Sequence, residues 1–213
     1  KAIMKQATDR LTAVRTIKAN QIQGYFHGIQ DQIQTFSEDR MVVEAMVGLK
    51  EAMTAVREEN EVTDQDVERM KEELSSFYGG DFARKYRTEN DGQQPNLDAQ
   101  LQPLDADTIA LQYEYIQQNP NELGKKDLLD QADDGSKYSS LHRLYHPVIR
   151  NYLRKFGYYD IFLVDIESGD IVYSVFKEVD FCTSLRDGPY ASTNFGRAFR
   201  EAAKATWKDA VAF

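Results

Sequence analysis

The sequence predicts an α+β fold in which long N-terminal helices precede a small antiparallel sheet. Apolar residues recur every three or four positions through the first part of the chain, which is the spacing of one helical face. After Gly157 the pattern changes to two short β-branched and aromatic runs, Tyr159–Val164 and Ile171–Phe176, separated by turn-forming residues around Gly169. Helices followed by a hairpin are typical of an α+β architecture.

The first helix is expected to be a rod of roughly 36 residues, about 50 Å long at 1.5 Å per residue. Gly24 and Gly28 each weaken it by about 1 kcal/mol relative to alanine, so packing must hold it. At Ser37–Asp39 either the rod bends or a new helix starts with Ser37 or Asp39 as its cap. The apolar face of the rod comprises Ile3, Ala7, Leu11, Val14, Ile17, Ile22, Tyr25, Ile29, Ile33 and Phe36.

A further helix is expected to begin at Thr63, which can cap it. Asp66 places a negative charge near the N-terminus of this helix, where the helix dipole is positive. Gly79-Gly80 is expected to end this helix. Residues 87–106 are polar and contain a glycine and two prolines, which predicts a long exposed loop.

Two more helices are expected before the hairpin. Asp107 is the predicted cap of a short helix, Thr108–Gln118, which Asn119-Pro120 ends. The second spans about Ser136–Lys155, and Gly157 stands where a glycine commonly follows a helix.

The hairpin strands are apolar on both faces, so they are expected to lie inside a larger sheet that is covered on both sides. A last helix is expected at Asn194–Lys208, with Trp207 facing inward, and Ala210–Phe213 is expected to start another strand. Because two strands and a stub do not make a self-sufficient sheet, further strands are expected beyond Phe213 or from another chain. The sheet is therefore expected to be incomplete at the C-terminus of this chain.

Three segments are expected along the chain. Residues 1–86 are predicted to form a helical stalk or bundle, residues 87–135 an acidic loop and short-helix linker, and residues 136–213 the part that carries the sheet. The middle segment holds most of the acidity, because residues 61–135 contain seven Lys/Arg and eighteen Asp/Glu. This charge is either a solvated surface or a docking face for a cationic partner.

Composition excludes several classes of protein. The 213 residues carry a net charge of −9, which argues against general nucleic-acid binding. A single cysteine excludes a disulfide framework and a cysteine-rich zinc site. No apolar stretch is long enough for a membrane span and no signal peptide is visible. The first residue is Lys1 rather than Met, so the chain is expected to be a piece of a longer protein.

No catalytic or cofactor-binding motif is present, so neither an enzyme nor a cofactor is predicted. The chain has no P-loop, GxGxxG, GxSxG or HExxH. His142 and His146 are four residues apart and could share a metal on one helical face, but no third ligand is evident. Hydrogen-bonded structural histidines are the favoured interpretation. Cys182 has no nearby histidine to activate it.

The strongest candidate site is a pocket for a small polar ligand at the hairpin and the loop that follows it. Cationic, anionic and aromatic side chains gather there beside a buried sheet, the combination typical of small-molecule sites. In the alternative, the tyrosines belong to the core and the charges, Glu178 included, form a solvated edge. The candidate ligand-binding residues are Tyr158, Tyr159, Tyr173, Lys177, Asp180 and Phe181.

The run from Gly157 to Leu185, GYYDIFLVDIESGDIVYSVFKEVDFCTSL, resembles the extracytoplasmic sensor region of bacterial methyl-accepting chemotaxis proteins of the PAS-like (Cache) type. The segments ALQYEYIQQNPNELGKKDLL (Ala110–Leu129), LHRLYHPVIRNYL (Leu141–Leu153) and GPYASTNFGRAFREA (Gly188–Ala202) are similar to segments that flank the sheet in that family. The resemblance covers about residues 105–213. The N-terminal helices share only the family's general character.

The resemblance implies a PAS-like sheet that binds a small molecule on the periplasmic side of the inner membrane. It also implies a membrane-anchored parent protein, a homodimer formed through the long N-terminal helix, and a cytoplasmic output domain. The same sensors precede methyl-accepting, histidine kinase and nucleotide cyclase modules, so the output stays open. An alternative of a different class is a structural helical-bundle protein that carries the hairpin as an appendage. Such a protein should continue a heptad repeat, whereas the apolar spacing here averages nearer 3.7 and is interrupted by glycines.

Overall fold

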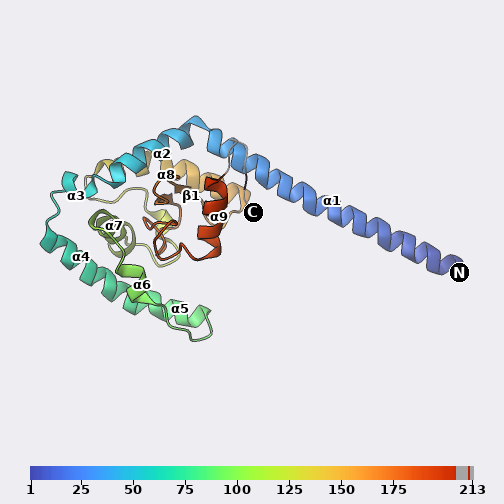
Figure 1. Cartoon of the computed structure of the whole chain (residues 1–213), viewed down its shortest axis with the longest axis horizontal. Helices are drawn as coiled ribbons and strands as arrows, with labels where there is room; N and C mark the ends of the chain where they lie inside the picture. The colour runs from blue at the N-terminus through green and yellow to red at the C-terminus, as the bar shows by residue number, and fades with distance from the viewer. Residues whose placement is uncertain (205–210, 212–213) are drawn as a thin grey trace.

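The first helix, α1 (Ala2–Glu38), projects from the rest of the molecule as a rod (Figure 1). None of its residues is buried. The computed structural model describes residues 1–204 and residue 211. Asp39 separates α1 from α2 (Arg40–Met53), because its carboxylate accepts a hydrogen bond from the Met41 amide at 2.8 Å. Asp39 is therefore the cap; the Ser37 hydroxyl donates back to the Gln34 carbonyl instead.

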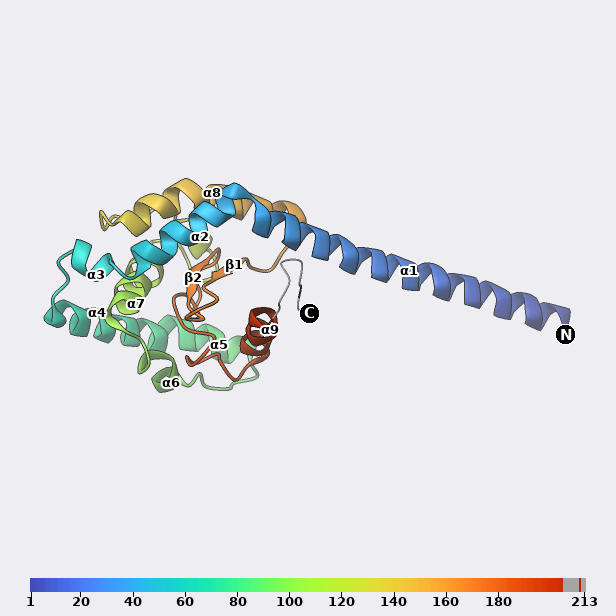
Figure 2. The same cartoon turned by 45° about the horizontal axis from the view of Figure 1, so that its top comes forward.

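Helix α2 lies beside α8 (Lys137–Phe156), and together they cover one side of the hairpin (Figure 2). Ser136 caps α8 by accepting a hydrogen bond from the Ser139 amide, and Gly157 follows the helix in the left-handed conformation, φ 73°. Both ends of α8 are confirmed to within a residue. The buried face of α2 comprises Val42, Ala45, Leu49, Ala52 and Met53.

On the other side of the molecule, the short α3 (Val56–Glu59) leads to α4 (Asp64–Phe77). Thr63 and Asp66 form a reciprocal capping box at the start of α4, which confirms the predicted cap. The expectation that Gly79-Gly80 ends this helix is wrong. The chain continues through a π-helical turn, η1 (Tyr78–Phe82), into α5 (Ala83–Glu89). Tyr78 and Ala83 extend the buried face, and this packing outweighs the glycine cost.

The segment predicted as a loop contains a short helix, α6 (Leu97–Leu101), whose last residue is buried. Helix α7 (Ala106–Gln112) follows, and a π-helical turn, η2 (Tyr113–Gln117), extends it. Asp105 caps α7 by accepting from the Thr108 amide at 2.7 Å, so the expectation of Asp107 as the cap is wrong. The Asp107 carboxylate accepts instead from the Arg57 amide at 2.9 Å, a contact with α3 that no local pattern reveals.

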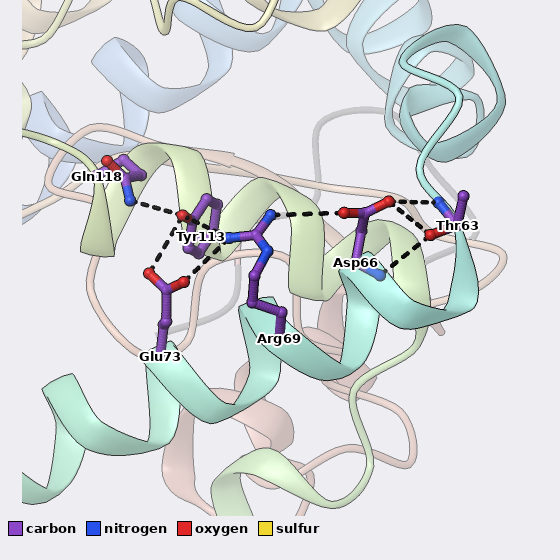
Figure 3. A network of polar contacts seen from close by, with 6 residues as sticks. All are labelled: Thr63, Asp66, Arg69, Glu73, Tyr113 and Gln118. Carbon is purple, nitrogen blue, oxygen red and sulfur yellow. Dashed lines mark hydrogen bonds and ion pairs between the residues drawn. The ribbon is translucent and has the colours of Figure 1, made fainter.

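A polar network fastens α4 to η2 around the hydroxyl of Tyr113 (Figure 3). Arg69 and Gln118 donate to this hydroxyl at 3.1 and 2.7 Å, and the hydroxyl donates to Glu73 at 3.2 Å. Arg69 also pairs with Glu73 at 3.0 Å. Because the ion pair is part-exposed, its stabilisation is small, and the shared hydroxyl chiefly fixes the register of the two elements.

The described residues contain a two-stranded antiparallel sheet, β1 (Phe162–Val164) and β2 (Ile171–Ser174). The predicted hairpin is confirmed, although both strands are shorter than expected. A bridge between Asp170 and Ser184 returns the chain to the start of β2. The described residues therefore form a mixed α+β fold that is mainly helical, in agreement with the predicted α+β class. The remaining elements are the 3-10 turn η3 (Lys126–Leu128) and α9 (Asn194–Ala203).

Several expectations for the C-terminus lie outside the described residues. These are the inward position of Trp207 and a strand at 210–213, of which Val211 alone is described, without regular structure. The last helix, α9, begins at Asn194 as expected but ends at Ala203, with Lys204 as its C-cap, so it is shorter than the expected Asn194–Lys208. One hydrophobic core joins α2, α4, α7, α8 and β2, and thus draws on all three predicted segments. No helix among residues 1–204 is long and apolar enough to cross a membrane.

Candidate functional site

The candidate site is built on β2 and the loop that follows it. Lys177 and Cys182, near the two ends of this loop, both have positive φ, 55° and 64°. Such values are uncommon for residues with a Cβ and are held only where the surroundings impose them. The loop closes on β2 because the Ile171 amide donates to the Thr183 carbonyl and the Cys182 amide donates to the Ile171 carbonyl. Lys177 is thereby directed into the interior.

Lys177 is 1% exposed and lies inside a cage of aromatic rings. Its Nζ is 4.3 Å from the ring centroid of Tyr173, 5.1 Å from that of Phe181 and 5.7 Å from that of Tyr115. Cation–π attraction to three ring faces partly offsets the loss of water around the amine. The Nζ also donates to the Ser174 carbonyl.

Burial dominates the electrostatics of the cage. Loss of hydration lowers the pKa of Lys177 from 10.5 to about 7, and the carboxylate of Asp160 opposes that change. Burial also raises the pKa of Asp160 to about 6. The Asp160 carboxylate accepts hydrogen bonds from the Ile161 and Val175 amides at 2.6 and 2.9 Å. Near neutral pH the amine and this carboxyl group are therefore both close to their titration points.

His142 and His146 stack on each other beside the cage, with ring centroids 4.3 Å apart. The Nε2 of His146 donates to the Asp127 carbonyl at 2.7 Å, since a carbonyl only accepts; its Nδ1 then accepts from the Tyr173 hydroxyl at 2.6 Å. By the same reasoning the Nδ1 of His142 donates to the Asp130 carbonyl at 2.7 Å. Its Nε2 is buried and has no hydrogen-bond partner among the described residues.

Both histidines are held neutral. Burial, with Lys177 as the next contribution, lowers the pKa of His146 to about 2 and that of His142 well below 6.5. A shared metal would need lone pairs from both rings, but His146 already uses both of its nitrogens. Within the described part of the chain, no three His, Cys, Asp or Glu residues gather in a metal-binding arrangement. The two rings thus act as part of the hydrogen-bonded core in this structure.

A cavity of about 180 Å³ lies between α5 and the loop after β2, and we call it the α5 cavity. Its wall includes Lys177, and the exposed ring of Tyr159 lies at its rim. Aromatic side chains, two lysines and two glutamates line it, which suits a small polar molecule. These lining residues include Phe82, Tyr86 and Tyr159, Lys85 and Lys177, and Glu89 and Glu178.

A second cavity, of about 270 Å³, lies where α1 meets α8 and β1, and we call it the α1 cavity. Phe36 packs on Tyr152 there, with ring centroids 4.3 Å apart. The hydroxyls of Tyr152 and Tyr158 both donate to Gln32, to its backbone carbonyl at 3.1 Å and to its side-chain oxygen at 2.8 Å. Asp160 also borders this cavity, whereas Lys177 borders the α5 cavity.

The predicted ligand-binding residues therefore divide into groups. Tyr173, Lys177 and Phe181 meet in the aromatic cage, and Tyr159 joins Lys177 at the α5 cavity. Tyr158 points instead to α1. Asp180 is partly buried; its Oδ1 has no hydrogen-bond partner among the described residues, and loss of hydration raises its pKa to about 7.

Sequence reasoning missed Tyr115, Lys85 and Asp160. Tyr115 comes from η2, far from the hairpin in sequence, and Lys85 comes from the turn of helix that Gly79-Gly80 was expected to preclude. Asp160 did carry a signal, because it is the one charged residue within the apolar run Tyr159–Val164. A charge inside a buried strand segment marks a group with a specific partner.

Comparison of the chain with models of protein families, with curated protein sequences and with solved structures finds no match.

Proposed function

We propose that this chain is the ligand-sensing extracytoplasmic domain of a transmembrane bacterial chemoreceptor. In this proposal the domain has a PAS-like (Cache) origin and lies on the periplasmic side of the inner membrane. It binds a small polar metabolite and passes the binding event through α1 to a cytoplasmic signalling domain. A membrane histidine kinase or nucleotide cyclase would use the same sensor with a different output.

The observation that carries the proposal is a pair of adjacent tyrosines between α8 and β1. Tyr158 donates to the side chain of Gln32 on α1, and Tyr159 lies at the rim of the α5 cavity. A molecule that contacts Tyr159 therefore acts one residue away from a contact with the rod. For signalling, the domain must exchange between two arrangements of the sheet relative to α1. A ligand shifts that equilibrium only by binding one arrangement more tightly than the other, and a coupling free energy of 1–3 kcal/mol is typical.

The geometry of α1 supports its role as the transmitting element. At 1.5 Å per residue its 37 residues extend about 55 Å, and its C-terminal end packs on Tyr152 through Phe36. The apolar stripe of the rod is exposed, with Leu11 71%, Val14 54% and Ile22 57% accessible. A stripe of this length on one helix is suited to a second copy of the same chain, so we propose a homodimer formed along α1.

Cysteine cross-linking tests this arrangement. Val14→Cys places a thiol on the apolar stripe, and Thr16→Cys places one on nearly the opposite face of the same turn. The native Cys182 is buried and gives little background. Under mild oxidation Val14→Cys should form disulfide-linked dimers at least about tenfold faster than Thr16→Cys, since only the stripe brings two thiols together.

The dimer along α1 would be contradicted if the two variants cross-linked at equal rates and if those rates fell with dilution, as expected for random collision.

The natural reading frame offers an independent check of the membrane receptor. A membrane receptor requires a hydrophobic span before residue 1 and another after the sheet.

A further inference from the structure

The polar side chains that border the α1 cavity are, with one exception, hydroxyls that already donate their hydrogens within the protein. The hydroxyls of Tyr152 and Tyr158 both donate to Gln32 on α1. The hydroxyl of Ser37 donates to a carbonyl of the preceding turn of the same helix. The exception is Asp160, whose ionised carboxyl group only accepts. Among the described residues that line it, the cavity therefore offers an acceptor and no free donor.

Asp160 has acceptor capacity left for a ligand. Its side chain is only partly buried. Its Oδ1 accepts hydrogen bonds from the Ile161 and Val175 amides at 2.6 and 2.9 Å, and the Phe176 amide adds a third backbone interaction. A carboxylate has about four acceptor sites, so at least one site remains for a donor that enters the cavity. A hydrogen bond to an ionised group is also roughly twice as strong as one between neutral groups.

The rest of the cavity wall is apolar or aromatic and suits a flat ring. The cavity volume is about 270 Å³, whereas an apolar cavity of about 150 Å³ is enough to hold benzene, so a bicyclic ring fits. Backbone amides already stabilise the charge of Asp160, and an ammonium ion would lose its hydration against such a wall, so a neutral donor is favoured over a cation. The apolar side chains of the wall are Ile33, Phe36, Val42, Ile161, Phe162 and Leu163.

We propose that the α1 cavity binds a neutral aromatic molecule that donates one hydrogen bond to Asp160, of the chemical class that indole represents. Such a molecule would contact α1 at Phe36, α8 at Tyr152 and β1 at Phe162, and so would act at the joint between the rod and the sheet. The α1 and α5 cavities share no lining residue among those described. The inference therefore depends neither on the α5 cavity nor on the membrane receptor proposed above.

Isothermal titration calorimetry with indole and benzofuran tests the inference on the full chain. The two molecules have nearly the same shape, but benzofuran has a ring oxygen where indole has its N–H group. At about pH 8, where a carboxyl group with a pKa of about 6 is ionised, indole should bind with a Kd of about 1 mM or tighter. Benzofuran should bind at least about tenfold more weakly, because it cannot donate a hydrogen bond to Asp160.

Three variants locate the binding site. Asp160→Asn keeps an oxygen for the backbone amides but removes the carboxylate, so indole should lose its advantage over benzofuran. Ser37→Trp places a large ring in the cavity from an exposed position on α1 and should abolish the binding of both molecules. Thr35→Trp is the matched control, because Thr35 is exposed on the same helix but does not line the cavity, and it should change neither affinity.

Three results would overturn the inference: equal affinity of the wild type for indole and benzofuran, no detectable binding of indole at millimolar concentration, or binding that Ser37→Trp leaves intact. The cross-linking of α1 is measured at other residues and without a ligand. The failure of this inference and the failure of the proposed function are therefore distinguishable.

Discussion

Replacing Lys177 by methionine is expected to remove about 2 kcal/mol of pH dependence from the free energy of unfolding between pH 7.5 and 9. The folded chain holds the pKa of Lys177 near 7, whereas the unfolded chain restores it to about 10.5. Between these values the unfolded state binds more protons, so raising the pH stabilises the fold by up to about 1.4 kcal/mol per pH unit. Methionine fills the same cage without a titrating group.

Urea denaturation of both proteins across this pH range measures the effect as a difference, which cancels titrating groups that do not interact with Lys177. The groups that face the amine, and whose titration changes with it, are Asp160, Asp127, Cys182, Arg150 and the two histidines. Lys125→Met serves as the control, because Lys125 is 61% exposed and pairs with Glu122 at the surface. If Lys177→Met and the wild type show parallel pH profiles, the amine is not buried as described.

Tyr138→Ala is expected to lower the free energy of unfolding by about 3–5 kcal/mol, the range typical of a large aromatic truncated in a core. Tyr138 is 0% exposed and packs on Tyr115 and Phe181, the rings that also surround Lys177. Its hydroxyl donates to the Val172 carbonyl in β2 at 2.7 Å, so the truncation also leaves a buried acceptor unpaired.

Two variants calibrate this loss by chemical denaturation. Tyr138→Phe keeps the ring and should cost only about 1–2 kcal/mol, the value of the buried hydrogen bond. Leu144→Ala lies on the exposed side of the same helix, where Leu144 is 63% accessible, and should change stability by less than about 0.5 kcal/mol. Equal losses for Tyr138→Ala and Leu144→Ala would show that α8 does not pack on the hairpin through Tyr138.

Elements set by local chemistry were predicted well. Thr63, Ser136 and Gly157 mark helix ends because a side-chain cap or a left-handed glycine acts within a few residues. Elements decided by distant contacts were not. Asp105 and Asp107 are equally good caps locally, and the Arg57 amide decides between them. Gly79-Gly80 is a stop signal that the packing of Tyr78 overrides.

In the candidate site, too, features set by local sequence were predicted and features set by distant contacts were not. Four residues near the hairpin were found because aromatic and charged side chains cluster within a short segment; they are Tyr159, Tyr173, Lys177 and Phe181. Their separation into a buried cage and a cavity rim follows from the inward turn of the chain at Lys177, where φ is positive, and from the arrival of Tyr115. Neither feature leaves a local pattern in sequence.

The central claim, that the α5 cavity binds a small molecule and reports it to α1, is tested most directly by a thermal-shift screen of amino acids, carboxylic acids and amines. At least one compound should raise the Tm of the wild type, since a ligand that binds only the folded state stabilises it. Tyr159 is 80% exposed, so Tyr159→Ala should preserve the fold and weaken that compound about tenfold, or about 1.4 kcal/mol. Ile166→Ala, at a 58% exposed site away from the cavity lining, should leave its affinity unchanged. A screen in which no compound shifts the Tm, or a hit that Tyr159→Ala does not weaken, would contradict the account.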